Sequence, residues 1–153
     1  MSNTQVDGRT LTMKRTFAAP VALVWEAWTR PEHIASWWGP PGMEVKIQAH
    51  DFQVGGQWRY SMTMPNGAEF ITEGVYKVIE EWKKIFSSAD FKPMTEGVDI
   101  QAIFEEAGEQ THFTFNVVHA TAEYAQQQKD MGFDKGWGSV FDNLANFLQQ
   151  QQG

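Results

Sequence analysis

The hydrophobic period of the chain changes along its length, and this change constrains the fold more than any other feature. Between residues 44 and 118, apolar and polar side chains alternate in short runs, as in strands that are buried on one face. In the last segment, apolar side chains recur every three or four residues, as on one face of a helix. An apolar sheet face needs a cover, and this segment is the only long amphipathic helix that the sequence predicts.

The alternating part predicts an antiparallel sheet. The pattern is clearest where Trp58, Tyr60, Met62 and Met64 alternate with polar residues, and Pro65-Asn66-Gly67 then supplies a hairpin turn. The other strands are expected at residues 10–17, 44–50, 70–78, 84–89, 98–104 and 111–118. The turns that join them are short, and parallel neighbours would need long crossovers.

Two short helices are expected after the first strand. Pro20 suits the first turn of a helix, and Val21, Val24, Trp25 and Trp28 then share one face. A second helix is expected at residues 32–37, and Gly39-Pro40-Pro41-Gly42 ends it.

The long C-terminal helix carries an apolar stripe, and the four glutamines at residues 149–152 are expected to fray beyond it. About 16 residues at 1.5 Å rise span about 24 Å, the length of a seven-residue strand at about 3.3 Å per residue. One helix can therefore lie along the sheet. We predict one α+β domain over residues 1–153, with an ordered core at about residues 10–149 and a curved sheet of six to seven strands wrapped on the C-terminal helix. The stripe consists of Asp134, Trp137, Phe141, Leu144 and Leu148.

Charge and composition exclude several classes of protein. The net charge is −7, and no basic cluster is longer than the pair Lys83–Lys84, which argues against nucleic-acid binding. The absence of cysteine excludes disulfides, thiolate zinc sites and a cysteine nucleophile. No run approaches the roughly 18 apolar residues of a membrane span, and the N-terminus lacks the apolar core of a signal peptide. A cytoplasmic protein without membrane insertion is expected.

Large rings and methionines dominate the strand faces turned toward the helix. Aromatic residues make up 14% of the chain, and such walls suit a small apolar ligand. The alternative is that the same side chains fill a solid core. Gly74, Gly136 and Gly138 favour a hollow interior, since they carry no side chain to fill it. The residues expected to line the pocket are Trp37, Trp38, Trp58, Tyr60, Met62, Met64, Phe70, Tyr76, Phe113, Phe115, Met131, Trp137 and Phe141.

The adjacent pair Trp37-Trp38 is unusual. Neighbouring side chains point in different directions, so the two rings are not expected to be buried in one core, and two arrangements are open. In the first, one ring lies in the core and the other lies at the rim of an entrance or on a partner surface. In the second, both rings cap the open end of the sheet.

The sequence shows no standard catalytic or metal motif. HExxH, a phosphate-binding glycine loop and GxSxG are all missing. The histidines, His33, His50, His112 and His119, lie far apart, and strand parity puts His50 and His112 on the polar face. No metal and no cofactor are therefore predicted.

Four polar side chains with inward parity are weak candidates for acid–base catalysis. They are Tyr60, Tyr76, His119 and Asp134. A carboxylate beside aromatic rings would have a raised pKa and could act as a general acid. For Asp134 we favour a structural role at the start of the helix, where the helix dipole stabilises a negative charge.

Six short elements of the sequence form a recognisable set in this order and spacing. They are residues 20–28, Trp37-Trp38-Gly39-Pro40, Asp51 with Gly55-Gly56, Met64 to Gly67, Gly74-Val75-Tyr76, and Gly136-Trp137 with Asp142 and Leu144. Together they resemble the START-like helix-grip superfamily (SRPBCC), to which the birch-pollen allergen fold belongs. The nearest group is homologous to the activator of the ninety-kilodalton heat-shock protein ATPase and is polyketide cyclase-like. The resemblance covers residues 12–148 and implies a helix-grip fold with an internal hydrophobic cavity, but the fold hosts many activities.

Three functions are compatible with these features. The first is the binding of a small hydrophobic molecule, such as a lipid, an aromatic or a polyketide-like compound. The second is a cyclase or hydrolase of a hydrophobic substrate, which predicts that at least two of the four acid–base candidates line one cavity. The third is a co-chaperone-like interaction module that uses the Trp37–Trp38 surface. A homodimer or a chaperone partner stays open.

Overall fold

In the computed structural model, one sheet curves around a long C-terminal helix. The structure describes residues 5–38, 44–63, 66–92 and 95–152. The strands are β1 (Gln5–Asp7), β2 (Thr10–Phe17), β3 (Val45–His50), β4 (Gln57–Thr63), β5 (Glu69–Glu80), β6 (Lys84–Lys92), β7 (Thr95–Ala107) and β8 (Gln110–Val118). The helices are α1 (Val21–Thr29), α2 (Pro31–Trp37), α3 (Ala122–Asp130) and α4 (Phe133–Gln152).

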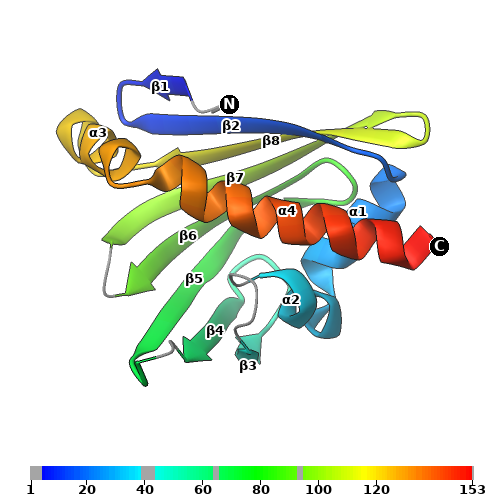
Figure 1. Ribbon diagram of the computed structural model, residues 1–153, viewed down its shortest axis with the longest axis horizontal. Helices are drawn as coiled ribbons and strands as arrows, with labels where there is room; N and C mark the ends of the chain where they lie inside the picture. Colours follow the sequence, from blue (N-terminus) through cyan, green and yellow to red (C-terminus); the bar gives the residue numbers. More distant parts are fainter. Residues whose placement is uncertain (1–4, 39–43, 64–65, 93–94, 153) are drawn as a thin grey trace.

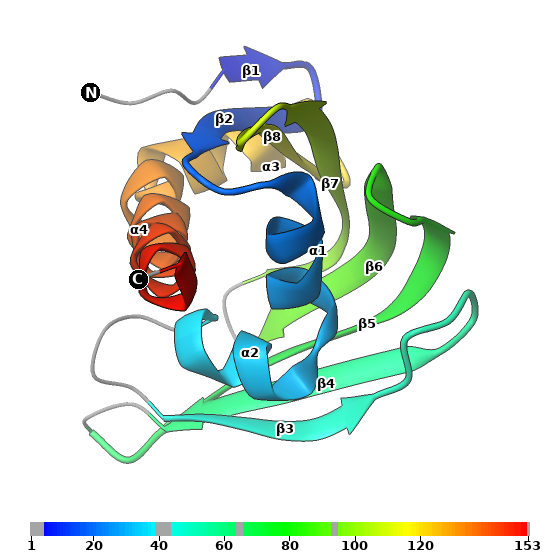
Figure 2. The ribbon, with the colours of Figure 1, turned by 90° about the vertical axis from the view of Figure 1, so that its right-hand side faces the viewer.

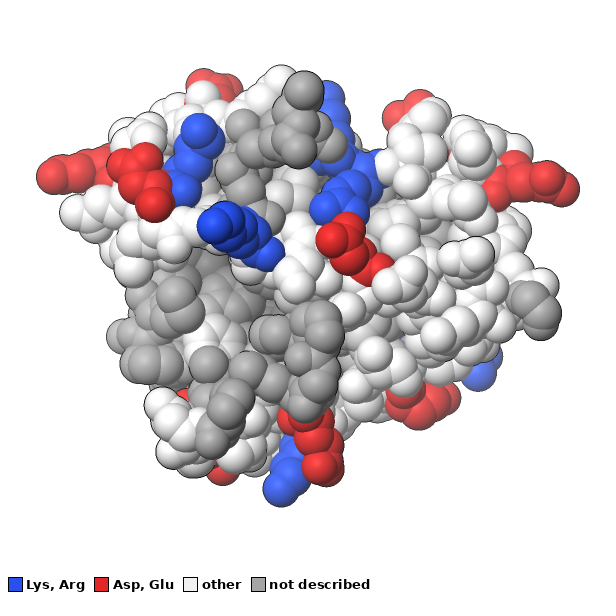
Figure 3. All heavy atoms as spheres, in the orientation of Figure 1, with Lys and Arg blue, Asp and Glu red and all other residues white. Residues whose placement is uncertain are grey.

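The sheet is antiparallel throughout, with the strand order β1-β2-β8-β7-β6-β5-β4-β3. Figure 2 shows the sheet curving from β1 and β2 to β3, with α1, α2 and α4 on its concave side. In Figure 1, α4 runs along this side and α2 lies next to it, in agreement with their contacts. The predicted helix-grip fold is confirmed. Figure 3 shows acidic and basic side chains interspersed over the described part of one face.

Three elements were not predicted from the sequence. β1 pairs with residues 10–12 but is exposed, so it carries no hydrophobic alternation and brings the sheet to eight strands in the described part of the chain. Helix α3 is polar and is capped by the Thr121 side chain, which accepts from the Tyr124 N–H. The glutamine tail is helical rather than frayed, and Gln152 Nε2 donates to the Ala18 carbonyl at 2.7 Å.

A bulge in β3 reverses the side-chain parity of its last residues. Ile47 lies opposite Tyr60, whereas Ala49 lies opposite Arg59, so Gln48 is an extra residue in the ladder. Such an insertion turns every following side chain to the other face of the sheet. His50 consequently lies opposite Trp58 and points to the concave face, and its predicted position on the polar face is wrong.

Candidate functional site

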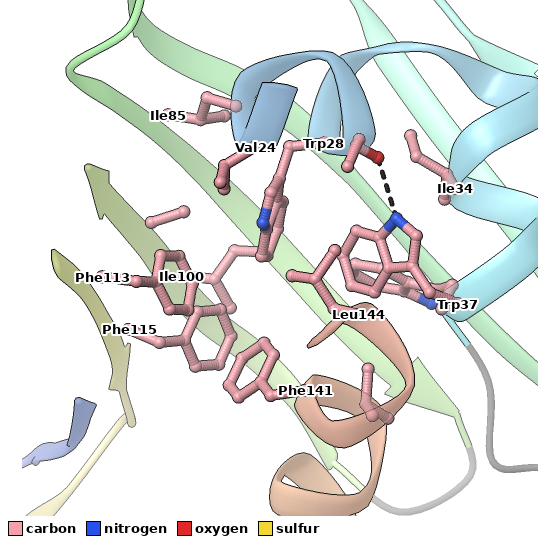
Figure 4. Close-up of a cluster of buried hydrophobic side chains, with 14 of the residues drawn as sticks. Val24, Trp28, Ile34, Trp37, Ile85, Ile100, Phe113, Phe115, Phe141 and Leu144 are labelled. Atoms are coloured by element: carbon pink, nitrogen blue, oxygen red, sulfur yellow. Dashed lines mark hydrogen bonds between the residues drawn. The ribbon is translucent and has the colours of Figure 1, made fainter. Parts of the chain in front are cut away.

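An aromatic cluster fills much of the space between the sheet and α4. Trp28 of α1 lies at its centre, and its ring centroid is 5.5 Å from that of Phe113 and 6.4 Å from that of Phe141 (Figure 4). Phe115 packs against Trp137 and Phe141 with centroids 4.6 and 5.1 Å apart. Four residues of this cluster were predicted to line the pocket, and they instead pack together in the core, as the solid-core alternative predicts. They are Phe113, Phe115, Trp137 and Phe141.

A small cavity lies beside this cluster, between α1, α2 and strands β4 to β7. It offers about 20 Å³ to the centres of water molecules, which is room for about one water. Trp38, Trp58, Tyr60 and Tyr76 are the predicted pocket residues that line it. The sequence analysis missed its other walls, although the alternation of Ile85, Ser87 and Ala89 on β6 is a signal that could have found two of them. The missed residues are Trp28, Ile34, Ile85, Ser87, Ile100 and Ala102.

Trp38 lines the cavity on the α2 side. Its Nε1 donates to Thr72 Oγ1 at 3.0 Å, and its ring centroid is 5.8 Å from Trp58 and 5.4 Å from Tyr60. The side chain is 5% exposed. Trp38 is thus a wall of the cavity and, at the same time, part of the hydrophobic core.

Trp37 is also buried, so the prediction that the two neighbouring rings are not both buried in one core is wrong. Its Nε1 donates to the Ala27 carbonyl at 2.8 Å, and its ring packs on Trp28 (Figure 4). Successive helical side chains point about 100° apart. The end of α2 lies between α1 and the sheet, so both directions meet core. The co-chaperone hypothesis therefore loses the contact surface that it required.

A chain of hydrogen bonds connects α1 to the cavity. His50 Nε2 lies 2.7 Å from the Thr29 carbonyl oxygen, His50 Nδ1 lies 2.8 Å from the Tyr60 hydroxyl, and Tyr60 is hydrogen-bonded to Tyr76. A carbonyl only accepts, so Nε2 carries the proton. In the neutral ring Nδ1 is then an acceptor, Tyr60 donates to it, and Tyr76 donates to Tyr60.

Burial fixes the protonation states along this chain. It lowers the pKa of His50, raises the pKa of Tyr76 to about 12, and raises the pKa of Tyr60 further in the same direction. Both tyrosines are therefore protonated and His50 is neutral near pH 7. The chain can position a polar group of a ligand, but it holds no ready base on the cavity side.

Among the described residues that line the cavity, the remaining polar side-chain groups are paired, with one exception. Trp58 Nε1 donates to Ser87 Oγ at 2.7 Å, and the Ser87 hydroxyl faces the carbonyls of Val75 and Ser88. Trp28 Nε1, in contrast, is buried with no hydrogen-bond partner among the described residues. Such unpaired donors are rare in protein interiors.

The glycines do not make the interior hollow as predicted. A Cβ on Gly74 would collide with the Ser88 carbonyl, because the backbones of β5 and β6 approach closely there. Gly136 is exposed on α4, and Gly138 lies next to the Arg15 guanidinium. None of the three leaves ligand-sized space facing the sheet.

The other predicted residues lie away from the cavity. Met62 is buried on β4 and Phe70 packs against the core from β5. Met131 is 66% exposed after α3, so it cannot be part of an internal wall. Met64 and the side chain of Asp134 lie outside what the structure describes.

Of the four acid–base candidates, Tyr60 and Tyr76 line one cavity. His119 does not join them. It is buried near Tyr124 of α3, with its backbone N–H donating to the Arg9 carbonyl.

Comparison with known proteins gives a consistent match over nearly the whole chain. The sequence profile described as "Activator of Hsp90 ATPase homolog 1-like protein" matches residues 18–149. The crystal structure of protein Ms6760 from Mycobacterium smegmatis is similar with a TM-score of 0.87 and 27% identity, covering 98% of each chain. Protein NE0264 from Nitrosomonas europaea is similar with a TM-score of 0.80 and 25% identity, over 94% of this chain and 96% of that one.

A third structure shares the fold alone. The AHSA1 protein from Silicibacter pomeroyi is 18% identical, with a TM-score of 0.73 over 93% of this chain and 99% of that one. No curated protein matches the chain in sequence. Among the described residues, no helix is both long and apolar enough to cross a membrane.

Proposed function

This chain belongs to the family of Activator of Hsp90 ATPase homolog 1-like proteins, and on that premise we propose that it binds a small hydrophobic molecule at the cavity beneath Trp38. The observation that carries the proposal is the composition of the cavity wall. Aromatic and aliphatic side chains surround a few fixed polar atoms from Trp28, Tyr60, Tyr76 and Ser87. Small-molecule sites have this combination of apolar walls and sparse polar groups.

The ligand must take the place of a side chain, because the cavity itself has room for about one water. Trp38 is the side chain we infer to move. It follows the last residue of α2, and its indole is held by one hydrogen bond, to Thr72, and by packing against five neighbouring aromatic rings. When the indole leaves, the space that opens is that of a two-ring molecule and is continuous with the cavity.

Ligand binding can be measured with naphthalene as the probe. We expect naphthalene to raise the midpoint of thermal unfolding of the wild-type protein, because a ligand of the folded state stabilises it. Trp38→Ala should lose about 3–5 kcal/mol of stability and regain part of it with naphthalene, which fills the space vacated by the indole. Trp82→Ala is the matched control, since Trp82 is 48% exposed on the turn after β5.

The result that opposes the proposal is equally clear. It is the absence of any naphthalene-induced shift in the wild type and in Trp38→Ala, together with native mass spectra that show the bare chain. An equal shift in all three proteins would mean that naphthalene binds elsewhere.

One observation favours the catalytic alternative, a cyclase or hydrolase of an apolar substrate. Tyr60 and Tyr76 meet in the same cavity and are hydrogen-bonded to each other. With their raised pKa values they would act as donors to a developing negative charge rather than as bases. Hydrolysis of 4-nitrophenyl hexanoate that falls at least 100-fold in Tyr76→Phe would support this role, and hydrolysis at the buffer rate would oppose it.

A further inference from the structure

The chemistry of the ligand follows from an unpaired donor, Trp28 Nε1, on a residue that lines the cavity, and this inference rests on the proposed function. Trp28 is 6% exposed, and its Nε1 has no partner among the described residues. In Figure 4 the nitrogen lies on the edge of the indole that is turned toward Val24 and Ile100, and Ile100 also lines the cavity. A buried N–H without an acceptor loses the hydrogen bond that it makes with water in the unfolded chain.

The other donors of the wall already have acceptors. Trp38 Nε1 donates to Thr72, Trp58 Nε1 donates to Ser87, and the tyrosine hydroxyls form the chain that ends at His50. Trp28 Nε1 can donate one hydrogen bond and cannot accept any. The group that completes this wall is therefore an acceptor oxygen of the ligand.

The wall also selects against charge. Among the described residues that line the cavity, none is acidic, basic or a histidine. The nearest titratable ring in the hydrogen-bond chain, His50, has a pKa lowered by burial and is neutral near pH 7. A buried carboxylate would have no counter-ion here, and its desolvation would go uncompensated.

We propose that the ligand is an uncharged, two-ring-sized carbonyl compound, a ketone or an ester, whose carbonyl oxygen accepts a hydrogen bond from Trp28 Nε1. Its oxygen occupies the cavity, which has room for about one such atom, and its rings take the place of the Trp38 indole. Trp28 is then the residue that distinguishes a carbonyl compound from a hydrocarbon of the same shape.

The probes are 1-indanone and indane, which share one two-ring skeleton and differ in the carbonyl group, together with indane-1-carboxylate. Dissociation constants are measured by calorimetry for the wild type, Trp28→Phe and Trp37→Phe. The ratio of the 1-indanone and indane affinities should fall about 3- to 10-fold in Trp28→Phe, the equivalent of one neutral hydrogen bond. Comparing ratios cancels the different solubilities of the two probes.

Trp37→Phe is the matched control. It also removes one buried indole N–H, on a ring 4.9 Å from that of Trp28, but this N–H donates to Ala27 and Trp37 does not line the cavity. The affinity ratio should stay at the wild-type value in this variant. The carboxylate should bind at least 10-fold more weakly than 1-indanone.

A second measurement needs no variant of Trp28. In proton–nitrogen spectra of the wild type, the indole N–H signal of Trp28, assigned through its contact with the Phe113 ring, should move downfield with 1-indanone and not with indane. One outcome overturns this inference and leaves the proposed function standing. It is that indane binds, that the ratio of the 1-indanone and indane affinities is the same in Trp28→Phe as in the wild type, and that 1-indanone does not move the Trp28 indole N–H signal. If neither probe binds, this inference is overturned, and the naphthalene measurements decide the proposed function.

Discussion

His50 Nδ1 lies 2.8 Å from the Tyr60 hydroxyl, and this contact joins β3 to the polar end of the cavity. The other ring nitrogen of His50 is held by the Thr29 carbonyl at the end of α1. The imidazole therefore fixes the orientation of Tyr60, and through it that of Tyr76. The cavity wall depends on a residue that does not itself line it.

Removal of the Tyr60 hydroxyl should destabilise the fold. Tyr60→Phe leaves His50 Nδ1 without a donor and Tyr76 without its acceptor, so we expect a loss of about 1–3 kcal/mol in the free energy of unfolding by urea. A double-mutant cycle with His50→Ala should give a coupling energy of about 0.5–3 kcal/mol. Strictly additive effects would mean that the two side chains act independently.

Stability should fall as the pH falls below about 6.5. Burial lowers the pKa of both His50 and His119 from 6.5, so the unfolded chain binds protons at a higher pH than the folded chain does. The contribution of these histidines is complete above pH 6.5 and is lost as the pH falls from there toward their folded pKa values. Urea unfolding at pH 7.5 and pH 5.5 measures the difference.

The pH dependence can be assigned with two variants. His119→Gln should reduce the loss of stability between pH 7.5 and 5.5, whatever its effect at pH 7.5. Trp82→Ala, which changes an exposed side chain that carries no titratable group, should leave the pH dependence unchanged. A wild-type stability that is constant or higher at pH 5.5 would contradict the role given to the buried histidines.

The fold could be predicted because it follows from hydrophobic period, and parts of the site could not because they depend on local exceptions to it. Alternation located the faces of Trp58 and Tyr60 correctly. It placed His50 on the wrong face, because the extra residue Gln48 shifts the ladder and no composition signal marks such a bulge. Helix α3, which the structure describes in full, escaped prediction because six of its nine side chains are polar and Ala125 alone is buried, so it carries no apolar stripe.

The sequence pattern also could not predict whether the interior is solid or hollow. Parity identifies inward residues, but it does not tell whether two inward rings meet or leave space. Phe115 and Trp137 were predicted as opposite walls, and their ring centroids lie 4.6 Å apart. The cavity lies instead between α1, the end of α2 and strands β4 to β7, and this junction depends on the packing of elements distant in sequence.

Weakening the hold on Trp38 should lower stability and raise ligand affinity together. Thr72→Val keeps the shape of the side chain but leaves Trp38 Nε1 without its acceptor, at a cost of about 1–3 kcal/mol. If the ligand binds the form in which Trp38 has moved, a larger population of that form tightens the apparent binding of naphthalene, by about 5-fold or more.

Thr111→Val is the control for this prediction. Thr111 is also buried and donates to the Ala19 carbonyl at 2.8 Å, outside the cavity. It should lose stability without any gain in affinity. Weaker naphthalene binding by Thr72→Val than by the wild type would argue that Trp38 stays in place when a ligand binds.

The same substitution at two glycines should have opposite effects, because the two differ in what surrounds them. At Gly74 an added Cβ meets the backbone carbonyl of Ser88, which cannot move without disturbing the β5–β6 ladder, so Gly74→Ala should cost about 1–3 kcal/mol or more. At Gly136 no atom lies within 4 Å of the added Cβ and the backbone is helical. Gly136→Ala should therefore raise the free energy of unfolding by about 0.5–1 kcal/mol, through helix propensity alone.

Thermal and urea unfolding of both variants, with naphthalene present and absent, separate packing from ligand space. If Gly136 faced a ligand cavity, its extra methyl group would weaken naphthalene binding, whereas an exposed position on α4 leaves that affinity unchanged. Because Gly74 brings β5 against β6 beside the Trp58 indole, which donates to Ser87, Gly74→Ala should disturb the cavity wall and weaken naphthalene binding as well. A harmless Gly74→Ala would show that β5 and β6 lie further apart at this point.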